Sequence, residues 1–139
     1  FLYVRLGIKK IIIIGLLAWI IRFVFFGFGD AASLVWMFYI AILLHGICYD
    51  FFFVSGQIYT DAKAGPTIKS QAIGLITLAT YGIGMFIGSL VSGWVKDAYT
   101  VEEVTNWTGI WLFPAYIVAA VLVFVAIFFH EKKKAKTLS

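Results

Sequence analysis

Four long apolar segments, separated by short polar connections, set the architecture of this 139-residue chain. The segments span Ile8–Phe28, Ser33–Tyr59, Ser70–Val95 and Trp107–Phe129. Each is near the roughly 20 residues that an α-helix needs to cross the hydrocarbon core of a bilayer. Because lipid offers no hydrogen-bond partner to a bare peptide group, a segment that spans it should be helical. The sequence therefore predicts an all-α integral membrane protein with four transmembrane helices.

The composition supports this class and argues against others. The chain is 63% hydrophobic and 13% charged, whereas a soluble domain is about 45–50% apolar and about 25% charged. Its basic residues cluster at the ends of the apolar segments, so membrane topology explains the net charge of +4 and no nucleic-acid partner is expected. The single cysteine, Cys48, provides no disulfide framework. We expect neither a metal nor a cofactor.

Lysine and arginine are distributed unevenly between the two sides of the predicted helices. The N-terminal flank, the second connection and the C-terminal tail together hold nine, whereas the first connection has none and the third has only Lys96. Cytoplasmic connections are enriched in basic residues, so both termini are predicted to be cytoplasmic, with residues 130–139 as a basic tail. Arg22 lies inside the first segment. Its side chain either extends to the membrane interface or pairs with an acidic residue on a neighbouring helix.

The second segment carries polar side chains within an apolar run. Its polar and small residues share one sector of a helical wheel drawn at 100° per residue: His45, Gly46, Tyr49, Asp50 and Gln57. An ionisable side chain at the centre of a membrane helix costs about 2.5–3.5 kcal/mol on insertion scales. This sector is therefore expected to face protein or water rather than lipid. We interpret it as the lining of a cavity.

Each residue of that sector has a structural alternative. His45 and Tyr49 are four residues apart and are therefore neighbours on a helix, where they either face a ligand or form hydrogen bonds between helices. Asp50 either carries a coupled proton or fixes the cavity through a hydrogen bond. Gln57 and Gly46 are weaker candidates for the cavity surface.

A stripe of small and polar residues follows one face of the third segment: Ser70, Gly74, Thr77, Tyr81, Gly84, Gly88 and Ser92. Gly84 and Gly88 have the four-residue spacing that lets membrane helices approach closely, which predicts a helix contact there. The first and fourth segments have no such stripe and are expected to face lipid. The sequence contains neither G-x-S-x-G nor H-E-x-x-H, and we do not expect an enzyme.

Two stretches of the chain resemble one known family. The residues HGICYDFFFVSGQIYTD and KSQAIGLITLATYGIGMFIGSLVSGW are similar to the last third of bacterial nucleoside:proton symporters of the major facilitator superfamily. The opening VRLGIKK resembles the basic loop before the ninth helix of those transporters, and LAWIIRFVFFGFGD resembles that helix.

This resemblance implies that the four segments are helices nine to twelve of a twelve-helix fold. Residues 1–139 would then form the C-terminal part of the second six-helix half. It further implies that the tenth helix lines the substrate cavity. His45 and Tyr49 would face the nucleoside, and Asp50 matches an acidic position of the family.

The sequence thus predicts a fragment of a proton-coupled nucleoside permease that imports nucleosides by alternating access. Its expected partners are a nucleoside, a proton, the lipid bilayer and the missing helices of the same carrier, in the bacterial inner membrane. The opening residues lack a signal-peptide pattern, and we expect a piece of a longer protein. Two alternatives stay open: a superfamily carrier for a sugar or another small polar solute, and a self-contained four-helix membrane module for assembly.

Overall fold

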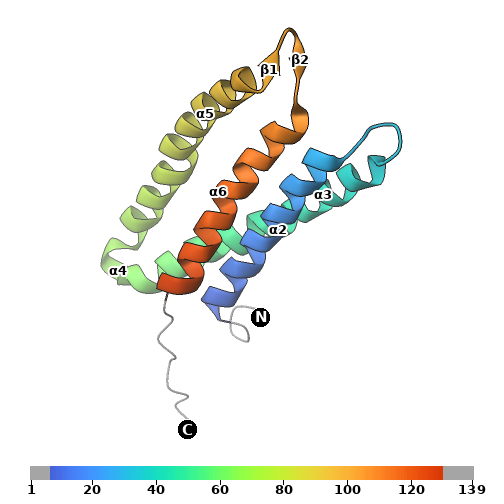
Figure 1. The fold of residues 1–139 in the computed structure, drawn as a ribbon. Helices are drawn as coiled ribbons and strands as arrows, with labels where there is room; N and C mark the ends of the chain where they lie inside the picture. The colour runs from blue at the N-terminus through green and yellow to red at the C-terminus, as the bar shows by residue number, and fades with distance from the viewer. Residues whose placement is uncertain (1–6, 130–139) are drawn as a thin grey trace.

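The computed structural model describes residues 7–129 and is almost entirely helical (Figure 1). The α-helices are α2 (Ile8–Phe28), α3 (Val35–Tyr49), α4 (Ser55–Thr77), α5 (Met85–Ala98) and α6 (Trp107–Phe128). Two π-helical segments, η1 (Asp50–Val54) and η2 (Leu78–Gly84), join α3 to α4 and α4 to α5. A short antiparallel hairpin of β1 (Thr100–Val101) and β2 (Val104–Thr105) leads into α6. The predicted basic tail lies outside the described residues.

Three helical stretches are long and apolar enough to cross a membrane: Ile8–Phe28, Val35–Ala98 and Trp107–Phe128. The middle stretch runs from α3 to the end of α5 and joins two segments that the sequence predicts as separate. The predicted count of four spans is therefore not confirmed. The reason is that the expected connection is helical on both sides of a single non-helical residue, Gly65, so no loop separates the two predicted segments.

Gly65 breaks the middle stretch without a loop. Its backbone has φ 70° and ψ 169°, a conformation that glycine adopts readily because it lacks a Cβ atom. Pro66 follows and has no N–H group to continue the helical hydrogen bonds. An ion pair joins the two sides of the break, with Lys69 Nζ 2.6 Å from Asp61 Oδ1. Both side chains are exposed to solvent, so this pair contributes little to stability.

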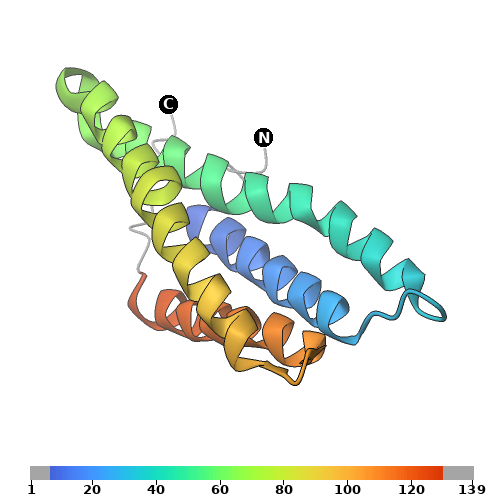
Figure 2. The ribbon, with the colours of Figure 1, turned by 90° about the horizontal axis from the view of Figure 1, so that it is seen from above.

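Helix α2 is the centre of the packed part of the molecule. It lies between α3 and α6 and contacts both (Figures 1 and 2). Trp111 of α6 stacks on Phe26 of α2 with ring centroids 4.8 Å apart. Thr108 of α6 donates its hydroxyl proton to the Gly27 carbonyl oxygen at 2.7 Å. One face of α2 is therefore buried within the protein, while Leu17 on another face is exposed.

Arg22, on α2, lies beside two aromatic rings of its own helix. Its guanidinium carbon lies 5.4 Å from the ring centroid of Phe26 and 5.7 Å from that of Phe23. A cation over an aromatic face is attracted by the negative potential of the ring. Among residues 7–129 the structure records no carboxylate paired with Arg22.

The connection between α2 and α3 is held by Asp30. Its carboxylate accepts hydrogen bonds from Ser33 Oγ at 2.7 Å and from the backbone N–H groups of Ala32 and Ser33. The hydroxyl of Ser33 lowers the pKa of Asp30 most, because these bonds favour the charged carboxylate. This contribution to stability is present above the ordinary aspartate pKa and is lost as the pH falls through the lowered folded-state pKa.

Gly15 brings α2 against the π-helical segment η1. A Cβ atom at Gly15 would lie 3.1 Å from Phe51 Cβ and 3.3 Å from the Phe52 backbone nitrogen. Trp19, one turn further along α2, meets Phe52 with ring centroids 5.4 Å apart. This is the kind of close approach that a small residue permits between membrane helices. The sequence places such a contact in the third segment and does not single out Gly15.

We expect Gly15→Leu to push α2 away from η1, because no space is available for its side chain. The amount of folded carrier recovered as a single peak by size-exclusion chromatography in detergent should fall severalfold. Gly15→Ala should be milder, since its Cβ requires neighbouring atoms to move by only a few tenths of an ångström. A normal yield of folded Gly15→Leu protein would contradict the close approach.

Helix α5 stands apart from this packed group. Val95 is its one buried residue, and Figure 1 shows α5 beside α6 and away from α3. Its contacts with α6 are sparse, and the hairpin after α5 ties the two helices together at one end. Asn106 caps the start of α6 by accepting a hydrogen bond from the Gly109 N–H at 3.0 Å. Most of the α5 surface is therefore uncovered by residues 7–129.

Candidate functional site

Three aromatic side chains, one each from the end of α3, from η1 and from η2, meet in one cluster. The ring centroids of Tyr49 and Phe53 are 5.4 Å apart, and those of Phe53 and Tyr81 are 5.6 Å apart. The Tyr81 hydroxyl donates a hydrogen bond to the Tyr49 hydroxyl. The cluster thus combines aromatic faces with a pair of hydroxyl groups. We call Tyr49, Phe53 and Tyr81 the tyrosine cluster.

The two π-helical segments position this cluster. A π turn contains more residues than an α turn and occurs frequently at functional sites. Tyr49 directly precedes η1, Phe53 lies within η1, and Tyr81 is in the middle of η2. Thr80 Oγ1 donates to the Ile76 carbonyl oxygen at 2.7 Å, and this kind of bond to the carbonyl four residues earlier often bends a helix, here where its winding changes.

The structure brings His45 and Tyr49 together, as their spacing predicts. Their ring centroids are 6.5 Å apart. His45, Gly46, Tyr49 and Asp50 are all exposed, and Gln57 is partly buried. The side of α3 that packs inward carries the buried residue Cys48 instead. The predicted polar sector therefore faces away from the buried core of the described helices.

Among the described residues, Asp50 and Gln57 lack a side-chain contact of the kind that joins His45 to Tyr49. Within the described part of the chain, the structure records no side-chain hydrogen bond or ion pair for either residue. The predicted position of Gln57 also assumes α-helical spacing from His45, and η1 interrupts that spacing. One added residue per turn rotates the side chains that follow, so Gln57 is displaced from the calculated sector.

Gly84 and Gly88 have no partner helix among residues 7–129. A Cβ atom at Gly88 would meet nothing within 4 Å, and one at Gly84 would lie 3.0 Å from the Ala79 carbonyl oxygen of the same helical stretch. Both glycines are exposed. The close helix contact predicted at these positions stays a prediction about a helix outside the described residues.

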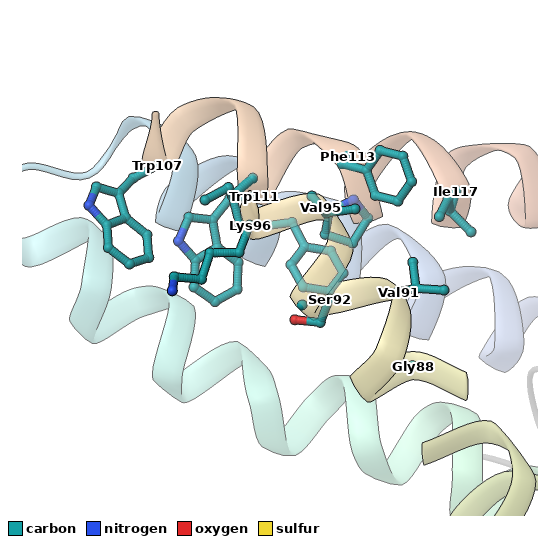
Figure 3. A pocket seen from close by; sticks show the side chains of 13 residues that line it. Gly88, Val91, Ser92, Val95, Lys96, Trp107, Trp111, Phe113 and Ile117 are labelled. Atoms are coloured by element: carbon teal, nitrogen blue, oxygen red, sulfur yellow. The ribbon is translucent and has the colours of Figure 1, made fainter. Parts of the chain in front are cut away.

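An apolar groove of about 530 Å³ lies between α5 and α6. Figure 3 shows Val91 of α5 on one wall and Phe113 of α6 on the other, with Lys96 and Trp107 toward one end. Of the predicted site residues, only Gly88 lines it. A polar solute needs several convergent hydrogen-bonding groups, and the walls of this groove are largely hydrocarbon. The tyrosine cluster, with His45 and Asp50 beside it, is therefore the better candidate for a solute site.

Sequence reasoning missed Phe53 and the role of Tyr81. Phe53 lies in a run of three phenylalanines, and the sequence does not indicate which of the three meets the tyrosines. Tyr81 belongs to the stripe of small and polar residues on the third segment. Because it shares that face with Thr77 and Gly84, the sequence predicts helix packing for it and no role in the site. Within residues 7–129, no three His, Cys, Asp or Glu side chains are grouped to hold a metal ion.

Long apolar helices carrying a polar, aromatic surface define the chain as part of a helical membrane protein. The family described as nucleoside H+ symporter matches residues 1–134. The chain therefore belongs to the nucleoside H+ symporter family, which confirms the resemblance seen in the sequence.

Individual relatives agree with this family. The chain is 33% identical over 135 residues to nucleoside permease NupG of Escherichia coli (strain K12), covering 96% of this chain and 32% of the permease. It is 37% identical over 135 residues to putative nucleoside transporter YegT of the same organism, covering 91% of this chain and 32% of that protein. The chain is 30% identical over 140 residues to xanthosine permease of Escherichia coli (strain K12), covering 95% of this chain and 32% of that permease.

A solved structure is also similar. The crystal structure of nucleoside transporter NupG superposes with a TM-score of 0.87 at 31% identity, covering 95% of this chain and 33% of that chain. The chain thus spans about a third of the length of the curated relatives it matches. These relatives are named as permeases or transporters, and none is named as an enzyme.

Proposed function

We propose that residues 1–139 are the C-terminal third of a proton-coupled nucleoside importer of the bacterial inner membrane. The observation that carries this proposal is the likeness to nucleoside transporter NupG, with a TM-score of 0.87 over 95% of the chain. The rest of the carrier would supply eight further helices. The described helices would then be numbers nine to twelve of a major facilitator fold, belonging to its second six-helix half.

The break at Gly65 supports four transmembrane spans. A helical stretch of 64 residues is far longer than the roughly 20 residues that cross a bilayer. A reversal at Gly65 divides it into two spans and places Lys63 and Lys69 on one side of the membrane. Both termini then share this cytoplasmic side with them. A reporter that is active only outside the cytoplasm, fused after Ser139, should give no signal.

The exposed sector of α3 supports a substrate cavity. In the proposed carrier, Tyr49 stacks on the nucleobase, and His45 hydrogen-bonds the sugar or the base. Gln57 and Gly46 border the cavity, and Asp50 carries the coupled proton or fixes the cavity. Binding near the middle of the membrane, between two halves that rock around the site, is how such carriers alternate access.

The uncovered surface of α5 supports the presence of further helices. A membrane helix that buries one residue among 14 has most of its surface available for other helices or for lipid. Gly84 and Gly88 are exposed at the start of this surface and suit a close helix contact. Gly88→Leu in the full-length carrier should then reduce folded protein, although nothing in residues 7–129 contacts that position.

Uptake by the full-length carrier tests this function. The gene is expressed in bacteria that lack their own nucleoside transporters, and radiolabelled uridine, adenosine, inosine and xanthosine are supplied separately. At least one should accumulate inside the cells above its external concentration, and a protonophore should abolish the accumulation. Excess unlabelled nucleoside should compete, whereas excess free ribose should not. Accumulation of ribose, or of none of the four nucleosides, would contradict the proposal.

A further inference from the structure

The hydrogen bond between Tyr81 and Tyr49 links two helical segments that are otherwise weakly joined. The two residues are 32 positions apart in the sequence. Other side-chain hydrogen bonds recorded for η2 and α5 stay local: Thr80 and Ser89 donate to carbonyl oxygens of their own helices. Among the described residues, the bond from Tyr81 to Tyr49 is therefore the side-chain hydrogen bond that the structure records between the η2–α5 segment and α3.

Phe53 provides a second connection between the same two tyrosines. Its ring lies 5.4 Å from the centroid of Tyr49 and 5.6 Å from that of Tyr81. Tyr81 therefore touches the candidate substrate residue directly through a hydroxyl and indirectly through an aromatic ring. Tyr49 is still 41% exposed, so its ring is held at one edge and open to a ligand elsewhere.

The direction of the hydrogen bond determines what the Tyr49 hydroxyl can do. A tyrosine hydroxyl has one proton to donate and lone pairs that accept. Tyr81 donates to the oxygen of Tyr49, which leaves the Tyr49 proton available for another acceptor. Hydrogen bonds in a chain polarise one another, so accepting from Tyr81 makes the Tyr49 hydroxyl a stronger donor.

We infer that Tyr81 is a positioning residue of the nucleoside site, which orients Tyr49 so that its hydroxyl donates to an oxygen or nitrogen acceptor of the nucleoside. This inference rests on the proposed function and deepens it. Tyr81 itself acts through Tyr49. The placement of Tyr81 in the middle of η2 gives that π-helical segment a role, since its winding sets the direction of the Tyr81 side chain.

Tyrosine-to-phenylalanine substitutions in the full-length carrier test the inference. Tyr81→Phe keeps the ring against Phe53 and removes the hydroxyl. We expect it to raise the KM for uptake by about fivefold, the loss associated with one hydrogen bond. The uptake at saturation per folded carrier should stay within twofold of wild type. The substrate is whichever of radiolabelled uridine, adenosine, inosine or xanthosine the wild type accumulates best.

The double variant separates positioning from an independent contact. Tyr49→Phe alone should raise KM by a similar factor. Tyr49→Phe combined with Tyr81→Phe should be no weaker than Tyr49→Phe alone, because both changes remove the same chain of hydrogen bonds. Tyr116→Phe is the matched control, since Tyr116 on α6 is 71% exposed and has no recorded side-chain partner among the described residues. It should leave KM unchanged.

Three results would overturn the inference. A wild-type KM for Tyr81→Phe would show that its hydroxyl does not act on the site. Effects of Tyr49→Phe and Tyr81→Phe that multiply in the double variant would show that the two residues act separately. A reduced amount of folded Tyr81→Phe carrier with an unchanged KM would show a purely structural role, and KM decides this because it does not depend on the amount of carrier. A wild-type carrier that accumulates no nucleoside is a different result, which removes the proposed function itself.

Discussion

Replacing Asp50 with asparagine in the full-length carrier should abolish accumulation of nucleoside against its gradient, while leaving nucleoside exchange across the membrane intact. Asparagine keeps the shape and much of the hydrogen-bonding capacity of aspartate but does not take up or release a proton. Asp50 has no recorded side-chain partner among residues 7–129, which favours a proton-carrying role over one that fixes these helices. Uptake driven by an imposed pH gradient and counterflow of labelled nucleoside in proteoliposomes measure the two properties.

Two further variants decide between the roles of Asp50. Asp61→Asn is the matched control, because Asp61 is paired with Lys69 beside the break at Gly65 and lies away from the tyrosine cluster. It should accumulate nucleoside normally. Near-normal accumulation by Asp50→Asn, with loss of folded protein in Asp50→Leu, would instead establish the cavity-fixing role. An Asp50→Leu carrier that folds and accumulates nucleoside normally would exclude both roles.

Replacing Tyr49 with alanine should weaken nucleoside binding by roughly tenfold or more, because the variant loses an aromatic surface for the base. Stacking of a base on an aromatic side chain contributes about 1–3 kcal/mol in complexes with single-stranded nucleic acids, and we use that scale by analogy. Tyr49→Phe keeps the ring and should be milder. Equilibrium binding of the labelled nucleoside to the purified carrier measures the effect directly.

The control for Tyr49→Ala is the same substitution at a tyrosine outside the tyrosine cluster. Tyr116→Ala on α6 removes an equally large aromatic side chain that is already 71% exposed. It should bind nucleoside as the wild type does. Equal affinity of wild type and Tyr49→Ala would refute the stacking role and would move the base to another part of the cavity.

The ends of the outer helices were predictable from hydropathy. The first predicted segment, Ile8–Phe28, coincides with α2, and the fourth begins at Trp107 as α6 does. Their polar flanks lie directly against long apolar runs, so the length of each run and its flanks determine the helix. The second and third segments merge because their polar connection forms helix up to a single glycine, and polarity alone does not distinguish a helical connection from a loop.

The candidate site was predictable only as far as α-helical spacing holds. His45 and Tyr49 lie on one continuous helix, so a four-residue spacing places them together. Gln57 lies beyond η1, and no feature of the sequence announces the extra residue of a π turn. Tyr81 and Phe53 join Tyr49 through contacts between segments, which periodicity within one segment does not reveal. Gly15 was missed for a related reason: apolar side chains occur on every side of α2, so its sequence does not indicate which face packs.

The break at Gly65 has a mechanical consequence. Because helix continues on both sides of Gly65, the two helical rods that meet there share a joint of a single residue. Only the backbone of Gly65 departs from helical geometry at this joint, so a change in the angle between the two rods falls on the residue with the widest choice of backbone conformations. The exposed Asp61–Lys69 pair bridges this joint and contributes little to its stability. The rods that carry Tyr49 and Tyr81 are thus joined at two places, by the single-residue break at Gly65 and by the pair of hydroxyl groups.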